Sequence, residues 1–268
     1  MSMARVNGVN LHYVEVGTGD PVLLIMGFGG DHLAWGFQTP VFAERYRVIA
    51  FDNRGAGQSD VPDVPYTTRM LADDAVGLLD HLKIERAHVI GVSMGGMIAQ
   101  EVALNHPKRV RSVQLHCTLA RPDRYMHALI ENWRVVRSNV TAEEWMRVVS
   151  LWLFAPVTYT ERPELVEAII QTGIANPHPF TLTGFLRQGD AVRSHDTLDR
   201  LATLAPPALV SVADDDILVP PRFSRELAGA IPRAAFTTIE RAGHCYFWER
   251  PDAFNAMCLE FLERNAKV

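Results

Sequence analysis

Short apolar runs alternate with amphipathic helical stretches along most of this chain, and this alternation limits its fold more than any other feature. The first buried apolar run, residues 22–26, is unbroken and is followed by glycines. The other short runs are residues 47–51, 87–90, 110–115, 208–212 and 235–239. Helical periodicity lies between several of them, at residues 67–82, 95–105, 222–230 and 253–264. Strands separated by helices need crossover connections, so the pattern predicts a largely parallel sheet covered by helices on both faces.

Two segments depart from this rhythm. Residues 11–16 alternate apolar and polar side chains, which predicts an exposed antiparallel strand ahead of the buried ones. Residues 120–203 have a mostly helical pattern, no convincing buried strand, and three of the five tryptophans. We therefore predict an α/β core formed by residues 1–119 and 204–268, with residues 120–203 as a helical cap over the carboxyl edge of the sheet.

Composition excludes several classes of function. The chain has 26 Lys and Arg against 31 Asp and Glu, a net charge of −5, and no basic run that could follow a nucleic-acid backbone. The apolar run at residues 22–26 is far shorter than the ~20 residues of a membrane span, and no export signal is visible. Three cysteines without metal-ligand spacing predict neither disulfides nor a zinc site, so we expect a cytoplasmic protein.

The most specific motif is Gly91-Val92-Ser93-Met94-Gly95, which joins a predicted buried strand to a predicted helix. A serine on so tight a turn has a strained backbone and closely packed neighbours, which explains the glycines two residues away on each side. The turn raises the Ser93 hydroxyl above the sheet and directs the Met94 N–H toward the same space. This context predicts a nucleophilic serine.

A serine hydroxyl needs a base, and the base needs an orienting carboxylate. An aspartate run at residues 214–216 and the dipeptide Gly243-His244 each follow a predicted strand, so both belong at the carboxyl edge of the sheet. Their order after Ser93 is that of one serine-hydrolase design, with the acid before the histidine. Of the nine histidines other than His244, His32 and His116 lie near this edge and the other seven fall in strands, at helix ends or in the insertion.

The chain resembles the α/β-hydrolase fold family over nearly its full length. The matching landmarks are residues 25–30, 52–55, the turn at Ser93, residues 214–220, and Gly243-His244 followed by residues 249–251. The resemblance implies a mostly parallel sheet of eight strands and a triad of Ser93, Asp216 and His244, with Asp215 as the fallback acid. It also implies that the backbone N–H groups of Phe28 and Met94 hold an oxyanion, and that the turn containing Asp52 and Arg54 braces loops.

Within this family the chain is similar to 3-oxoadipate enol-lactonases and to aminoacrylate-hydrolysing relatives. We therefore expect a serine hydrolase, free of cofactor and metal, that cleaves a small carboxylic ester or lactone through an acyl-enzyme. The same triad serves amide and C–C bond hydrolases, and related folds act as small-molecule receptors, so these alternatives stay open. The expected partner is a small-molecule substrate, and a homodimer stays open.

Four residues are expected to contact the substrate: Gly27, Trp152, Leu218 and Cys245. The aromatic residues of the insertion suggest an apolar wall made of Trp145, Trp152 and Phe154. Either Arg187 or Arg193 could receive a substrate carboxylate, and the sequence does not decide between them.

Overall fold

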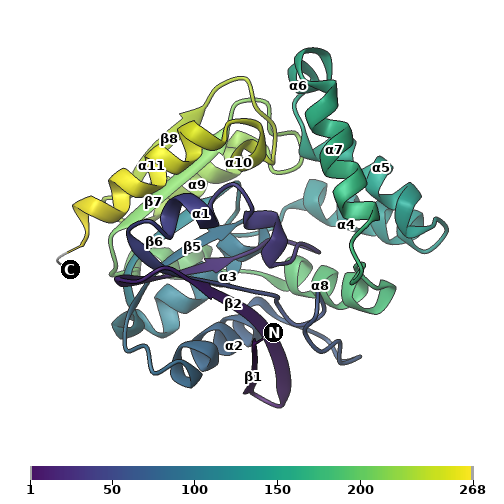
Figure 1. The fold of residues 1–268 in the computed structure, drawn as a ribbon. Coiled ribbons are helices and arrows are strands. Elements are labelled where there is room, and N and C mark those ends of the chain that lie inside the picture. The colour runs from purple at the N-terminus through teal and green to yellow at the C-terminus, as the bar shows by residue number, and fades with distance from the viewer. Residues whose placement is uncertain (1, 267–268) are drawn as a thin grey trace.

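An eight-stranded sheet forms the centre of the molecule (Figure 1). The computed structural model describes residues 2–266, and its strands follow the spatial order β1-β2-β4-β3-β5-β6-β7-β8. In chain order the strands are β1 (Ser2–Val6), β2 (Val9–Val16), β3 (Asp20–Ile25), β4 (Tyr46–Phe51), β5 (Ala87–Val92), β6 (Val110–His116), β7 (Ala208–Ala213) and β8 (Ala235–Ile239). Strands β3 to β8 pair in parallel, whereas β2 pairs antiparallel with both β1 and β4. The prediction of a mostly parallel eight-stranded sheet is confirmed.

Strand β1 lies outside the segments predicted as strands. It pairs with β2 across the two-residue loop Asn7-Gly8, in which both residues have positive φ, 45° and 84°. Such a loop matches the right-handed twist of a hairpin, and Asn-Gly is its strongest sequence signal. The signal for this hairpin was therefore present in the sequence.

Helices and short helical turns connect the strands. They are η1 (His32–Trp35), α1 (Thr39–Phe42), α2 (Thr68–His81), α3 (Met94–Asn105), η2 (Pro107–Arg109), α4 (Arg124–Arg137), α5 (Ala142–Leu153), α6 (Pro156–Glu161), α7 (Pro163–Ile174), α8 (Leu182–Ser194), η3 (Leu198–Thr203), α9 (Pro221–Ala230), α10 (Tyr246–Glu249) and α11 (Pro251–Arg264). No helix within residues 2–266 combines the length and apolar character that crossing a bilayer requires.

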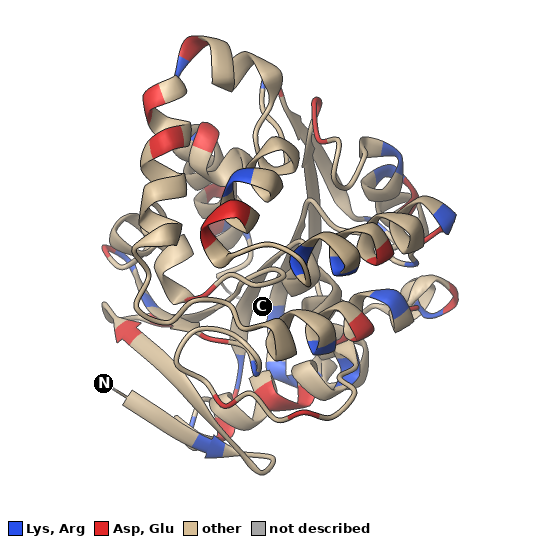
Figure 2. Ribbon diagram, turned by 90° about the vertical axis from the view of Figure 1, so that its right-hand side faces the viewer, with Lys and Arg blue, Asp and Glu red and all other residues tan. Residues whose placement is uncertain are grey.

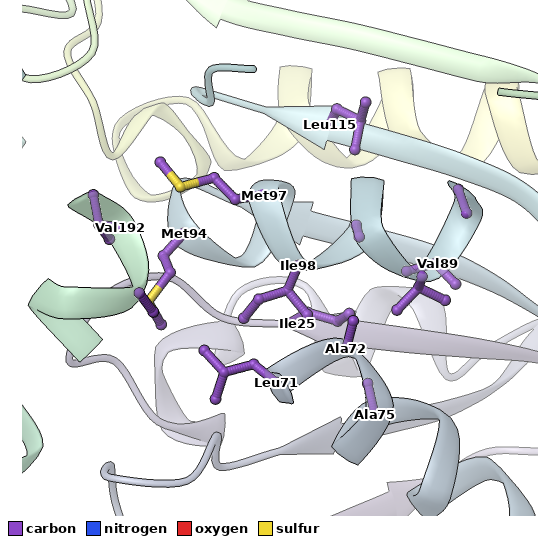
Figure 3. Packing of buried hydrophobic residues seen from close by; sticks show 14 of the residues in the cluster. Ile25, Leu71, Ala72, Ala75, Val89, Met94, Met97, Ile98, Leu115 and Val192 are labelled. Atoms are coloured by element: carbon purple, nitrogen blue, oxygen red, sulfur yellow. The ribbon is translucent and has the colours of Figure 1, made fainter. Parts of the chain in front are cut away.

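Side chains alternate between the two faces of the central strands, as the pleat of a strand dictates. Leu23 and Ile25 of β3 belong to the core beneath α2 and α3, and Figure 3 shows Ile25 among Leu71 and Ile98 of those helices. Val22 and Leu24 belong to a second core that includes Trp35 of η1 and residues of α1 and α11. Helices therefore cover both faces, as predicted.

Helices α4 to α8 lie between β6 and β7 in the chain, and we call them the helical insertion (Figure 1). In the turned view of Figure 2, basic and acidic residues are interspersed along the helices. The division of the chain at residues 120 and 203 into a core and a cap stays a prediction.

Three buried histidines are held in their neutral form. Burial lowers the pKa of His88 and His195 to about 4 and that of His116 to about 3. Each ring has a hydroxyl oxygen within 2.9 Å of Nδ1, which comes from Ser112, Thr68 and Ser211 respectively. The folded state therefore resists taking up protons that the unfolded chain accepts below pH ~6.5.

We predict that the free energy of unfolding falls as the pH drops below ~6.5. Because the pKa of each histidine is lower in the folded state, its contribution to the free energy of unfolding is complete above pH ~6.5 and is lost as the pH falls toward the folded-state pKa. At pH 5 each histidine has lost about 2 kcal/mol of this contribution. Urea unfolding between pH 4.5 and 7, at steps of roughly half a unit, measures this slope.

The variant His195→Gln should lower the number of protons taken up on unfolding by about one, and so flatten the slope. Equal slopes for the wild type and His195→Gln would contradict the account.

Candidate active site

Ser93 occupies a sharp turn between β5 and α3. Its backbone has φ 55° and ψ −122°, a region that non-glycine residues rarely adopt. The turn is fixed by hydrogen bonds on both sides: Ser93 N donates to the His116 carbonyl at 2.8 Å, and the Ser93 carbonyl accepts from Thr118 Oγ1 at 2.7 Å. The strain predicted for this serine is therefore observed.

Glycines make the turn possible because backbone atoms fill the space that side chains would need. A Cβ on Gly95 would lie 2.0 Å from the Ile25 carbonyl oxygen, and one on Gly91 would lie 2.2 Å from the Gly95 carbonyl oxygen. A Cβ on Gly27 would lie 2.9 Å from Ser93 Cβ and 3.6 Å from Ser93 Oγ. Gly27 therefore borders the serine directly.

The carboxylate of Asp216 lies against the imidazole of His244. Asp216 Oδ2 is 2.9 Å from His244 Nδ1, and both side chains are almost fully buried. The other oxygen, Asp216 Oδ1, accepts the N–H groups of Leu218 and Val219 at 3.0 and 2.8 Å. These bonds hold the carboxylate in one orientation, which in turn fixes the ring.

Asp215 has different surroundings. Its side chain is exposed, and its backbone N–H donates to the Ala242 carbonyl at 3.1 Å. Strands β7 and β8 are neighbours, so the loops that follow them lie side by side, and within these loops Asp216 is the aspartate that contacts His244.

Ser93 and His244 line the same cavity, whose volume is about 170 Å³. Gly27, Leu218 and Cys245 also line it, and their contact with a substrate stays a prediction. Burial raises the pKa of the Cys245 thiol well above its usual value, so this thiol stays protonated and unreactive.

Trp152 does not line this cavity, contrary to expectation. Trp133 lines it instead, and the Trp152 ring packs against Trp133 with centroids 6.1 Å apart. Trp145 borders the cavity, whereas Phe154 is buried with Val166 and Ile170. Only one aromatic residue of the expected wall therefore faces the site.

The backbone N–H groups of Phe28, which lines the cavity of Ser93, and of Met94, the residue after Ser93, have no acceptor among residues 2–266. Met94 is the first residue of α3, where backbone N–H groups have no partner within the helix. Phe28 lies in a turn closed by the bond from Gly30 N to the Gly27 carbonyl at 3.2 Å. Both groups are free to donate to a bound oxygen.

Gln188, which the sequence analysis missed, holds the turn that contains Phe28. Its side chain is fully buried, accepts from Gly29 N at 2.9 Å, and donates to the Arg54 carbonyl at 3.0 Å. Because Gln188 belongs to α8, the helical insertion fixes this turn. No local sequence pattern distinguishes Gln188 from other glutamines.

Glu249 makes a second link to the helical insertion. Its buried carboxylate accepts Gly243 N at 2.7 Å, next to His244, and Ala155 N at 3.0 Å from the insertion. Thr158 Oγ1 also donates to it. Burial raises the pKa of Glu249, although these three hydrogen bonds oppose the shift.

One cluster combines ligand types that a metal ion prefers: His12, His32 and Asp52, whose ligand atoms lie within 4.8 Å of one another. Asp52 already accepts His32 N at 2.7 Å and Gln58 N at 2.9 Å, and a third contact joins it to His32 Nδ1 at 2.8 Å. Burial raises the pKa of Asp52, but these hydrogen bonds outweigh burial and keep it low. The cluster is therefore best described as a hydrogen-bonded brace of the loops after β3 and β4.

The two arginines expected to meet a carboxylate are already paired. Arg187 contacts Asp63 at 2.7 Å and Asp190 at 3.0 Å, and Arg193 contacts Glu131 at 3.3 Å. Neither lines the cavity that contains Ser93.

We predict that Gly95→Ala destabilises the protein by about 3 kcal/mol or more, because its Cβ would collide with the backbone of β3. Urea unfolding measures the change. Gly229→Ala is the matched control, since Gly229 is exposed in α9 and has open space at its Cβ. The control should stabilise by up to ~1 kcal/mol, and similar values for the two variants would contradict the packing described.

Known proteins share this architecture. A family model described as the alpha/beta hydrolase fold matches residues 20–251. A Mycobacterium tuberculosis protein named non-heme bromoperoxidase BpoC is 35% identical over 94% of this chain and 97% of its own length. A protein of Azorhizobium caulinodans named carbamate hydrolase RutD is 33% identical over 97% of this chain and 98% of its own length. The crystal structure of the enol-lactonase from Burkholderia xenovorans LB400 has a TM-score of 0.89 at 29% identity, with 98% and 100% of the two chains covered. This chain therefore belongs to the α/β-hydrolase fold family of hydrolases.

Proposed function

We propose that this protein is a serine hydrolase that cleaves a small carboxylic ester or lactone through an acyl-enzyme on Ser93. One observation carries the proposal: the ring of His244, held by Asp216 at 2.9 Å, lines the same cavity as Ser93. An imidazole oriented in this way can take the serine proton through its second nitrogen.

In the first half of the reaction, Ser93 Oγ attacks the substrate carbonyl while His244 Nε2 accepts its proton. Asp216 keeps the remaining proton on Nδ1 and stabilises the charged ring. The backbone N–H groups of Phe28 and Met94 bind the oxyanion, and each such donor contributes about 3–4 kcal/mol to the transition state. His244 then protonates the departing alkoxide.

In the second half, water enters and His244 removes its proton as it attacks the acyl carbon. The tetrahedral intermediate uses the same two N–H groups and collapses to release the acid and restore Ser93 Oγ–H. In a lactone the alcohol and the acid belong to one molecule, so a hydroxy acid is released.

The likeness to an enol-lactonase supports an ester or lactone as the substrate. The same three residues also serve amide and C–C bond hydrolysis, and a receptor on this fold would bind without turnover. A panel of esters, lactones and amides, scored for multiple turnovers, decides among these alternatives.

We predict that Ser93→Ala lowers kcat for ester hydrolysis by about 10⁴-fold or more, because no other hydroxyl replaces the nucleophile. Alanine tolerates the positive φ no worse than serine does, so the thermal midpoint should stay nearly unchanged. Steady-state kinetics and circular dichroism provide the two measurements. If the folded variant keeps most of its rate, Ser93 is not the nucleophile.

We also predict that Asp216→Asn lowers kcat by roughly 10³–10⁴-fold, because an amide favours the wrong tautomer of His244. Asp215→Asn is the matched control and should change kcat by less than about threefold, since its side chain is exposed. Equal losses in the two variants would reopen the choice of acid.

A further inference from the structure

A second, larger cavity adjoins the one that contains Ser93. Its volume is about 540 Å³, within the ~300–1,000 Å³ typical of pockets for drug-sized ligands. The two cavities share lining residues, among them Gly30, Ala34, Trp145, Met146, Phe180 and Trp248. A molecule that reacts at Ser93 can therefore extend into the larger cavity.

Most of the side chains that line the larger cavity are apolar, and they come chiefly from η1, α5 and α7. Of its polar groups, Asp31 and Asn176 are bound to each other: Asn176 Nδ2 donates to Asp31 Oδ2 at 2.7 Å. The other oxygen of Asp31 accepts Leu33 N at 2.9 Å. These groups need no ligand to complete their hydrogen bonds.

Arg137, at the end of α4, differs from them. It lines the larger cavity but not the smaller one, and no carboxylate within residues 2–266 lies within 4.0 Å of its guanidinium. Its Nη2 donates to the Phe180 carbonyl at 3.0 Å, while its Nε is buried without a partner. Burial lowers the pKa of Arg137, and no acidic neighbour raises it.

Arg137 as a whole is half-buried, but its buried Nε has no hydrogen-bond partner within residues 2–266, and a bound anion could accept from it. A guanidinium matches a carboxylate especially well because its parallel N–H groups can bind both oxygens. The cavity therefore combines room for an apolar chain with an anion site at a distance from Ser93.

We propose that Arg137 binds a carboxylate at the far end of the substrate, whose apolar middle part fills the larger cavity. This inference rests on the proposed ester or lactone hydrolysis at Ser93 and specifies its substrate class: an ester or lactone joined by an apolar chain to a free carboxylate. Arg137 is then a specificity-determining residue, and Arg187 and Arg193 have no such role.

The test compares p-nitrophenyl monoesters of straight-chain dicarboxylic acids with p-nitrophenyl esters of fatty acids of the same length. For the wild type, kcat/KM of the carboxylate series should rise to an optimum length and then fall, because Arg137 is fixed in position. Arg137→Gln should lower that optimum roughly 10- to 100-fold, mainly through KM, and change the fatty-acid series less than about threefold.

The matched control is Arg134→Gln, one turn earlier on α4, because Arg134 pairs with Asp190 at 3.3 Å and lines neither cavity. It should leave the ratio between the two series unchanged. If Arg137→Gln lowers both series equally, Arg137 only supports the Phe180 backbone, and the inference is wrong.

Measuring ligand binding without turnover tests the role of Arg137 independently of the proposed reaction at Ser93. In a Ser93→Ala background, decanoate should bind at least about tenfold more tightly with Arg137 than with Arg137→Gln, while decanol should bind both equally. Calorimetric titration measures both ligands without turnover. Equal decanoate affinities would overturn the role of Arg137 even if Ser93 is the nucleophile, whereas tight decanoate binding without ester turnover would overturn only the reaction.

Discussion

Direct backbone contact between α3 and the central strands is the constraint on which the rest of the site depends. At Gly95 the helix lies so close to Ile25 of β3 that a single Cβ would penetrate a carbonyl oxygen. This approach leaves Ser93 no relaxed conformation, and the bonds to His116 and Thr118 hold it at positive φ. The free N–H of Met94 results from the same turn, because it begins the helix.

The remaining parts of the site are held by polar side chains that cross between elements. Gln188 fastens the turn of Phe28 to α8, and Glu249 fastens the loop of His244 to the segment after α5. Both side chains are buried, and their oxygen atoms accept hydrogen bonds from backbone N–H groups. Removing the Gln188 or the Glu249 side chain would therefore leave buried backbone groups without hydrogen bonds. The helical insertion therefore supports the loops on both sides of Ser93 as well as lining the cavity.

The sequence was sufficient where the signal was local or topological. The strand–turn–helix context identified Ser93, and parallel strands placed the loops of Asp216 and His244 at the same edge of the sheet. It was insufficient where a contact joins distant segments: Gln188 meets Gly29 across 159 residues. The pattern of α4 also does not reveal that Arg137 donates to the Phe180 carbonyl and meets no carboxylate within residues 2–266. Helical periodicity likewise could not show that Trp133, and not Trp152, lines the cavity.

The proposed chemistry makes one covalent species obligatory, and mass spectrometry detects it directly. The His244→Gln variant, which lacks the base, should be acylated by an activated ester because such an ester is highly reactive. Its deacylation should be slowed more than its acylation, so the acyl-enzyme should accumulate. We expect the intact mass to increase by one acyl group, which peptide mapping places on the peptide that contains Ser93. An acyl group mapped reproducibly to another residue, with Ser93 unmodified, would contradict the proposed chemistry.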